Sequence, residues 1–429
     1  MRALLALFHA GHEIPITEAS GFFDSTLLDE LADAEIVRRQ ADSLVSAYRI
    51  SPADGLLILH DPSHPLRREF VGGVGPAART LASLTLRHSV DSALDLCAGC
   101  GYQALLLARH ARTVIATDIL PRALWLTNFN SQLNGVSNVE CRQGNFFEPV
   151  AEERFDLIAC NPPFIVSPDT EYAFRDSGLG GDSVSEMVLT SLTEHLNDGG
   201  FATAIVNWGL QDGEQWEEPG TRWLTGRGCD AIFIRWDASE PLSYTAMWNA
   251  DLREPSPAEY AAALDRWSAY LSGLGFERIA QLGVVLRRRA GTNWNLGFET
   301  SNAPSGNAAH QIARMFAARD FLAEHHGDLL DHRFALVEGH RLDQGMNFKN
   351  GSYDIFSAAM SLPDAGVGLQ GEVPANLIPL LFSLSSGTLR EVTTTLAKEM
   401  DADLDELQKQ TLTMVRRLFE RGLLKRLGP

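Results

Sequence analysis

The centre of the chain alternates short apolar runs with longer segments in which apolar residues recur at helical spacing. The apolar runs predict strands at 92–96, 113–117, 155–160, 201–206, 231–235 and 282–286. The periodic segments predict helices at 102–110, 121–133 and 184–196, and a further helix that begins at Ser256-Pro257. Strands that alternate with helices are typical of a mostly parallel, doubly wound α/β sheet. We therefore expect such a sheet to form the core of the central domain.

The pattern changes on both sides of this region. Residues 1–70 predict a small accessory domain, and the Gly72-Gly-Val-Gly75 turn before Pro76 marks the entry to the central domain, 71–290. The helix at 184–196 is predicted to start with a capping box that pairs Ser183 with Glu186.

Beyond the central domain, residues 291–429 form a third region. Amphipathic helices are predicted at 389–400 and 404–421, followed by a short strand at 422–427. This order of elements is typical of a winged helix, which we place at about 376–429.

Composition narrows the class of protein. Among 429 residues there are 36 Lys and Arg against 55 Asp and Glu, a net charge of −19, which disfavours indiscriminate coating of nucleic acid. No apolar run is long enough to cross a bilayer, so we expect no membrane association. Five cysteines form no disulfide framework, which predicts a reduced, cytoplasmic protein. Although Cys97 and Cys100 have metal-ligand spacing, no second pair accompanies them, and we expect no metal.

The first candidate site is the turn Asp95-Leu-Cys-Ala-Gly-Cys-Gly101 between a predicted strand and helix. Glycines let a ligand approach the backbone closely, and Asp118, at the end of the next strand, is suited to accept hydrogen bonds from a ribose diol. The run from Gly99 also satisfies the dinucleotide fingerprint G-x-G-x-x-A, so an NAD-dependent oxidoreductase is an alternative. Asp95 favours a cationic ligand, because a carboxylate there would repel a pyrophosphate.

The second candidate site is Asn161-Pro-Pro-Phe164, directly after a predicted strand and about 60 residues after the glycine turn. With these two motifs in this order, the region Asp95–Leu196 resembles the class I S-adenosylmethionine-dependent methyltransferases that modify planar nitrogen. The relatives are adenine or guanine amino-methyltransferases and glutamine methyltransferases of polypeptide release factors. The resemblance implies a Rossmann-like methyltransferase sheet and the cofactor S-adenosyl-L-methionine.

The resemblance also implies residue roles. The Asn161 side-chain oxygen and the Pro162 carbonyl would accept hydrogen bonds from the NH2 group that is methylated, and Phe164 would stack on its planar carrier. Asn145 replaces the acidic residue that relatives commonly place against the adenine, with Phe146 packing beside it. The complete predicted cofactor site is Asp95, Cys97, Gly99, Gly101, Asp118, Ile119, Asn145, Phe146 and Asn161.

The acceptor is left open between an RNA or DNA base and a protein such as a release factor, and the sequence predicts no oligomeric state. The basic residues of the last helix, Arg416 and Arg417 among them, are compatible with nucleic-acid contact or with protein docking. A third hypothesis is a non-catalytic regulator in which the central domain senses S-adenosylmethionine and the winged helix binds its target.

Overall fold

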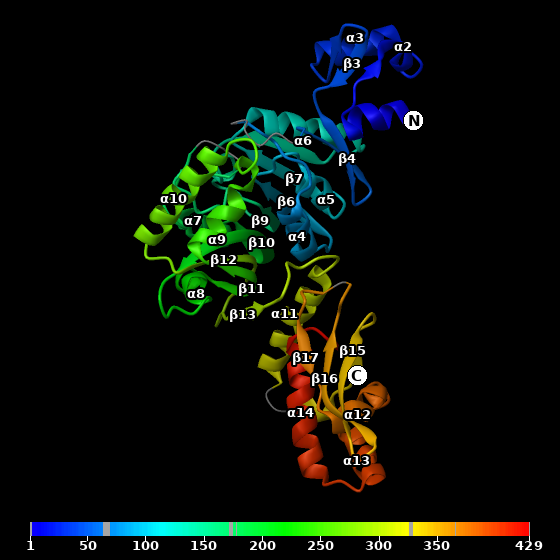
Figure 1. The fold of residues 1–429 in the computed structure, drawn as a ribbon. Helices are drawn as coiled ribbons and strands as arrows, with labels where there is room; N and C mark the ends of the chain where they lie inside the picture. Colours follow the sequence, from blue (N-terminus) through cyan, green and yellow to red (C-terminus); the bar gives the residue numbers. More distant parts are fainter. Residues whose placement is uncertain are drawn as a thin grey trace. The chain divides into compact units, whose positions relative to one another are not determined.

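The computed structural model describes residues 2–62, 69–170, 175–176, 178–325, 329–364 and 366–428. They form two compact units, of which the first contains the described residues of 1–233 and 237–297 and the second those of 234–236 and 298–429. Figure 1 shows the helices and strands of both units.

The first unit is built on an eight-stranded sheet with the strand order β13-β11-β12-β10-β9-β6-β7-β8. Its strands are β6 (Val90–Leu96), β7 (Ala111–Asp118), β8 (Val139–Gln143), β9 (Phe155–Cys160), β10 (Leu196–Leu210), β11 (Cys229–Ser239), β12 (Arg278–Arg288) and β13 (Asn295–Glu299). From β8 to β10 every pairing is parallel, whereas β12 runs antiparallel to β10. The sequence-based prediction of a mostly parallel sheet is confirmed.

The strand order reverses at β6, which lies between β7 and β9. The chain first builds the sheet outward from β6 through β7 to β8 and then returns to add β9 and β10 on the other side of β6. In sheets of this kind the connections on the two sides leave in opposite directions, which opens a crevice at the carboxyl ends of the central strands. Leu96 and Cys160 are register partners at those ends.

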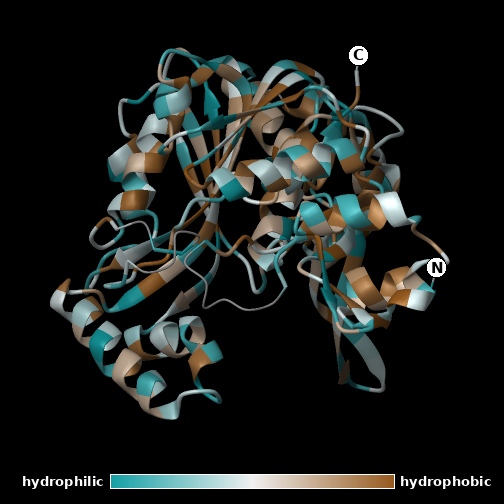
Figure 2. Cartoon of the chain, turned by 90° about the horizontal axis from the view of Figure 1, so that it is seen from above, coloured by the Kyte–Doolittle hydropathy of each residue, from teal (hydrophilic) through white to brown (hydrophobic). Residues whose placement is uncertain are grey.

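Helices cover both faces of this sheet. They are α4 (Pro76–Leu84), α5 (Tyr102–Leu107), α6 (Pro121–Leu133), α7 (Ser183–Glu194), α8 (Glu218–Leu224), α9 (Pro241–Trp248) and α10 (Pro257–Gly273). Alternate residues of β10, such as Ala204 and Val206, share one apolar cluster with α7 and α8. Helices α4, α5 and α6 contribute instead to a second cluster. Most helices in Figure 2 carry both polar and apolar colours, as expected of helices with one buried side.

The local start signals were only partly predicted. Helix α6 has the predicted limits, with Pro121 in its first turn. The capping box expected at Ser183 is wrong: Asp182 occupies the N-cap, Ser183 is the first helical residue, and no side chain caps the helix. The Asp182 carboxylate is engaged elsewhere, because it accepts the Gly209 N–H at 3.0 Å.

The segment before α4 packs against the central domain. It contains a three-stranded sheet of β1 (Ile14–Pro15), β3 (Ser43–Ser46) and β2 (Val37–Gln40), and a hairpin of β4 (Arg49–Ala53) and β5 (Leu56–His60). Leu7, Ile58 and other residues of this segment lie in the same apolar cluster as Leu105 of α5 and Leu126 of α6. The Asn130 amide of α6 accepts the N–H and donates to the carbonyl of Leu59, at 2.8 and 2.9 Å.

The second unit contains a long helix, a three-stranded antiparallel sheet and a C-terminal helical pair. Its elements are α11 (Ala309–Glu324), β14 (Phe334–Leu336), β15 (Arg341–Lys349), β16 (Ser352–Ser361), β17 (Gln370–Glu372), α12 (Ile378–Ser383), α13 (Leu389–Met400), α14 (Leu404–Glu420) and β18 (Leu424–Arg426). Helices α13 and α14 occur where the sequence predicts them.

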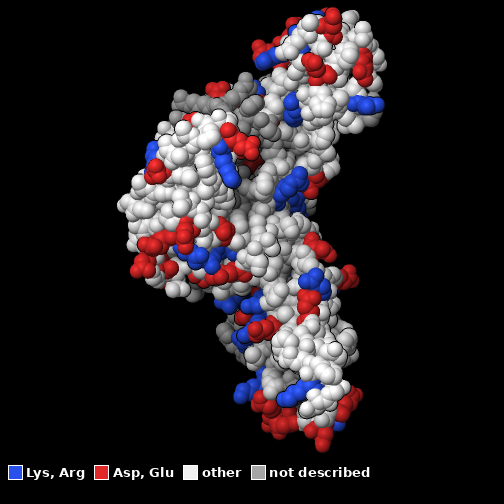
Figure 3. Space-filling view, in the orientation of Figure 1, with Lys and Arg blue, Asp and Glu red and all other residues white. Residues whose placement is uncertain are grey.

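The final strand β18 pairs antiparallel with β14, far upstream in the chain. The winged-helix assignment and the boundaries proposed for the three regions stay predictions. Acidic residues gather where α13 meets α14, among them Glu399, Asp401 and Asp405 (Figure 3). Within the part of the chain that the structure describes, no helix has both the length and the apolar character needed to span a membrane.

Candidate active site

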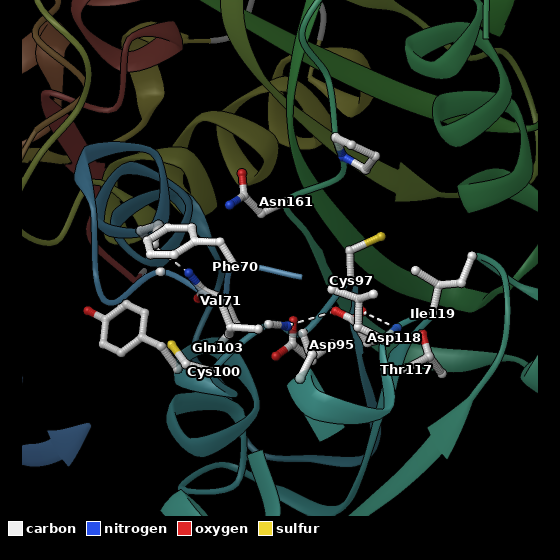
Figure 4. Close-up of a pocket in the computed structure, with 18 of the residues that line it drawn as sticks. Phe70, Val71, Asp95, Cys97, Cys100, Gln103, Thr117, Asp118, Ile119 and Asn161 are labelled. Atoms are coloured by element: carbon white, nitrogen blue, oxygen red, sulfur yellow. Dashed lines mark hydrogen bonds between the residues drawn. The ribbon is translucent and has the colours of Figure 1, made fainter. Parts of the chain in front are cut away.

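A cavity of about 320 Å³ opens at the carboxyl ends of β6, β7 and β9, at the point where the strand order reverses. It is lined by Phe70, Val71, Gly72, Gly73, Ala78, Asp95, Cys97, Ala98, Gly99, Cys100, Tyr102, Gln103, Thr117, Asp118, Ile119, Leu120, Ala123, Asn145, Phe146, Asn161, Pro163 and Asp176. The two sequence motifs therefore meet at one site. Figure 4 shows Phe70 across the cavity from Asp118 and Ile119.

The turn after β6 follows a backbone path that needs its glycines. Gly99 and Gly101 have φ values of +56° and +78°, and Cys97 also lies in the left-handed region at +63°. A Cβ on Gly101 would lie 2.7 Å from the Thr127 methyl group, whereas a Cβ on Gly99 would have no atom within 4 Å. Gly99 thus leaves open space beside the cavity, and Gly101 allows the turn to approach α6. Gly101 itself is not among the residues that line the cavity.

Two carboxyl groups, those of Asp95 and Asp118, lie near the ends of β6 and β7 beside this turn. Asp95 is 1% exposed, and one of its oxygens accepts the Ala104 N–H at 2.8 Å. Burial raises the pKa of Asp95 to about 7; the Ala104 hydrogen bond opposes this rise and the charge of Asp118 adds to it. Burial also raises the pKa of Asp118, although this carboxylate accepts backbone N–H bonds from Gly99 and Leu120, both at 2.9 Å. These carboxyl groups favour a ligand that brings positive charge or hydrogen-bond donors.

The Asn161 side chain reaches the cavity from the end of β9 (Figure 4). Its Oδ1 atom is buried and has no hydrogen-bond partner among the described residues. A buried acceptor without a partner costs free energy unless a ligand supplies the donor. Asn161 is therefore poised to accept a hydrogen bond from a group that enters the cavity.

The rest of the Asn-Pro-Pro-Phe motif lies around this acceptor. Pro163 lines the cavity, while Pro162 and Phe164 are buried and do not. The Phe164 ring packs edge-on against Trp248, with ring centroids 6.2 Å apart. The predicted stacking of a substrate on Phe164 stays a prediction.

The remaining predicted cofactor residues, Ile119, Asn145 and Phe146, also line the cavity. Ile119 is 53% exposed, which leaves an apolar surface at the cavity mouth. Phe146 has a φ of +46°, a conformation that is unusual for a bulky residue and turns the chain sharply after Asn145. Apart from Gly101, the residues predicted to bind the cofactor thus come together around one cavity.

One wall of the cavity, made by Phe70, Val71, Gly72 and Gly73, was not predicted from the sequence. This wall is held by Asp61, which is 2% exposed and accepts the Val71 N–H at 2.9 Å. Asp61 also forms an ion pair with Arg122, at the start of α6. The glycines at 72–75 are the local signal in the sequence, but by themselves they predict only the entry to a domain.

The chemistry of the cavity fits S-adenosylmethionine. Its carboxylates suit the ammonium group and the ribose hydroxyls, its glycine turn leaves room for a ligand, and Asn161 offers a free acceptor beside the cofactor space. When bound, S-adenosylmethionine supplies a methyl group on a positively charged sulfur. Among the described residues, no cluster of three or more His, Cys, Asp or Glu side chains is arranged to hold a metal.

Comparison with known proteins identifies the family of the domain that contains this cavity. Residues 72–211 match the model of the methyltransferase small domain family. These residues therefore form a class I S-adenosylmethionine-dependent methyltransferase domain, and the resemblance predicted from the sequence is confirmed.

The chain is similar to a release factor glutamine methyltransferase of Aliivibrio fischeri, 31% identical over 33% of this chain and 54% of the relative. It is also similar to a ribosomal protein uL3 glutamine methyltransferase of Bradyrhizobium diazoefficiens, 30% identical over 46% of this chain and 66% of the relative. The chain thus spans about half to two thirds of the length of these relatives. Among solved structures, M. jannaschii TYW2 in complex with AdoMet matches with a TM-score of 0.33 and 14% identity, over 57% of this chain and 87% of that one.

Proposed function

We propose that this protein transfers a methyl group from S-adenosylmethionine to the planar amide nitrogen of a protein side chain. The observation that carries the proposal is the buried Oδ1 atom of Asn161, which has no partner among the described residues and lies at the edge of the cofactor cavity. An amide nitrogen is a poor nucleophile because its lone pair is delocalised into the carbonyl group. A fixed acceptor for its N–H favours the pyramidal geometry in which the lone pair is available.

The chain's own residues supply positioning rather than a general base. Asn161 and the carbonyl of Pro162 would orient the NH2 group, and the two consecutive prolines limit movement of these acceptors. Well-positioned reactants lower the barrier by about 7–11 kcal/mol relative to free encounter. The proton lost by the amide nitrogen can pass to solvent after transfer.

Two observations favour protein over nucleic acid as the acceptor. The relatives named above are glutamine methyltransferases that act on a release factor and on a ribosomal protein. In addition, residues 240–276, which pack on the loop that carries Asn161, hold five acidic residues against two basic ones. The net negative charge of this segment would repel the phosphate backbone of a nucleic acid. A cytoplasmic location belongs to this proposal, because release factors and ribosomes act in that compartment.

The test is transfer of a radiolabelled methyl group from S-adenosylmethionine into a lysate of cells that lack this protein. Purified ribosomes and release factor are offered as separate acceptors, and the products are divided between nuclease and protease digestion. We expect label that resists nuclease and is released by protease, with methylated glutamine after hydrolysis. Label released by nuclease would instead identify a nucleic-acid base. Tight cofactor binding without label in any fraction would favour the sensor hypothesis.

A further inference from the structure

Helices α9 and α10 follow β11 and precede β12 in the chain, and they pack against each other (Figure 1). We call them the covering helices. They contact the acceptor loop, defined as residues 161–182, which joins β9 to α7 and begins with Asn161. The described residues of this loop are bound to the covering helices at three separate points.

The first point is Tyr244 of α9, whose side chain is fully buried. Its hydroxyl oxygen accepts the backbone N–H of Val166 at 3.0 Å and a side-chain N–H of Asn207, on β10, also at 3.0 Å. Val166 is itself fully buried. One hydroxyl group thus joins the acceptor loop to both a covering helix and the central sheet.

The other two points lie on α10. The Asp169 carboxylate accepts two hydrogen bonds from Arg266, at 2.9 and 3.1 Å, and one from the Trp267 indole N–H at 2.7 Å. Further along the loop, the Gly181 N–H donates to the Tyr270 hydroxyl at 2.7 Å. Bidentate and indole hydrogen bonds fix both the place and the direction of a carboxylate.

We propose that Tyr244 is a positioning residue for methyl transfer, a proposal that rests on the function proposed above. Asn161 follows directly on β9, so the sheet fixes one end of the segment 161–166. Tyr244 fixes the other end through Val166, and two prolines stiffen what lies between. The Asn161 acceptor is thereby held at the cavity edge, where displacement by about 1 Å lowers turnover by up to ~100-fold. Asp169 supports the same loop a few residues further on.

The test replaces Tyr244 by phenylalanine, which keeps the ring and removes the hydroxyl. Hydrogen exchange is followed by mass spectrometry on the full chain with S-adenosylmethionine present. We expect exchange of the Val166 amide to quicken at least tenfold, and exchange of residues 95–101 to stay unchanged. Methyl transfer to the lysate acceptor should fall by about tenfold or more, with the KM for S-adenosylmethionine within twofold of the wild-type value. Tyr260→Phe is the matched control, since the Tyr260 hydroxyl forms none of the three contacts between the covering helices and the acceptor loop described above.

Asp169→Asn is a second variant, at a partly exposed site where folding is less at risk. It removes the charge that Arg266 binds, and it should also quicken exchange in the loop and lower turnover without changing cofactor affinity. Unchanged exchange at Val166 in Tyr244→Phe overturns the proposal, and so does faster exchange with wild-type turnover. If the wild-type chain itself transfers no methyl group, the proposed function fails. That outcome is distinct, because the exchange difference between Tyr244→Phe and Tyr260→Phe is measured without any acceptor.

Discussion

The Asp118 carboxylate accepts a hydrogen bond from the backbone N–H of Gly99 at 2.9 Å. This bond joins the ends of two neighbouring strands, since Gly99 belongs to the turn after β6 and Asp118 is the last residue of β7. The residue expected to bind the ribose thus also fixes the turn expected to contact the rest of the cofactor. Either role would explain a need for a carboxylate at this position, and together they couple the shape of the turn to ribose binding.

Replacement of Asp118 by alanine should weaken S-adenosylmethionine binding. The variant loses the acceptor for the Gly99 and Leu120 N–H groups as well as that for the ribose hydroxyls. A hydrogen bond to a charged group contributes about 1.5–3 kcal/mol, so we expect the Kd to rise at least about tenfold. Isothermal titration calorimetry measures the change. Exposed Asp91→Ala is the control and should bind as the wild type does.

Replacement of Asn161 by alanine should separate catalysis from binding. The variant loses the acceptor for the reacting NH2 group, and we expect turnover to fall by about 100-fold or more. Cofactor affinity should change less than about threefold, because one neutral contact at the cavity edge is lost. Rates of label transfer and calorimetric Kd values give the two numbers. Wild-type turnover in this variant would refute the assigned role, and exposed Asn302→Ala is the control.

Cofactor affinity should increase with pH through the titration of Asp95. Burial raises the pKa of this carboxyl group from 3.8 to about 7, so the folded chain holds a proton that the unfolded chain releases. The contribution of Asp95 to the free energy of unfolding therefore decreases as the pH rises from about 4 to about 7. A cationic ligand binds the ionised form, whose population rises about fivefold between pH 6 and pH 7. Calorimetry in that range should show a Kd about fivefold lower at pH 7, and Asp95→Asn should remove most of this dependence.

The two glycines of the turn should respond differently to alanine. At Gly101 the Cβ would lie 2.7 Å from Thr127 and φ is +78°, so strain and overlap together should cost about 3 kcal/mol of unfolding free energy. At Gly99 the Cβ has open space and only the positive φ opposes it, at about 1 kcal/mol. Urea denaturation of the two variants measures the difference. Equal destabilisation would mean that the close approach of Gly101 to Thr127 of α6 contributes nothing to the free energy of unfolding.

Loss of the ion pair between partly exposed Arg122 and buried Asp61 should affect both stability and binding. Arg122→Ala leaves the buried Asp61 carboxylate without its cation, and we expect a loss of about 2–4 kcal/mol. Because Asp61 also holds Val71, which lines the cavity, the Kd for S-adenosylmethionine should rise as well. Arg112→Ala is the matched control. It breaks a pair with Asp91 in which both side chains are more than 70% exposed, and it should cost less than about 1 kcal/mol.

The strands that the sequence predicted well are buried on both faces of the sheet and therefore consist of continuous apolar runs. Strand β9 has the predicted limits, and the predicted 201–206 is the buried centre of the longer strand β10. Helix α6 also has the predicted limits, with Pro121 in its first turn. Strand β8 was missed because Val139–Gln143 lies at the sheet edge and is mostly polar. The β15–β16 hairpin was missed for a related reason, since its large apolar residues such as Phe348 and Tyr353 are exposed and no core fixes their period.

In the candidate site, the residues that could be predicted are those next to the end of a buried strand. Residues that a strand delivers to the cavity, such as Asp95 and Asn161, were predictable because their distance from the strand end is fixed. Phe70 and Val71 were not, since only the tertiary fold brings them to the cavity through Asp61. The contacts of Tyr244 with the acceptor loop could not be predicted from the sequence for the same reason. Hydrogen bonds over 78 residues leave no local pattern in the sequence.

The apolar cluster shared by the N-terminal segment with α5 and α6 has a consequence for synthesis on the ribosome. Ile58 and its neighbours emerge first, but Leu126, with which they are buried, is made only after some seventy more residues. Until α6 has emerged, the N-terminal segment has no complete core and its apolar side chains remain accessible to chaperones. Folding of this segment and completion of the cofactor cavity are therefore expected to occur as one event during translation.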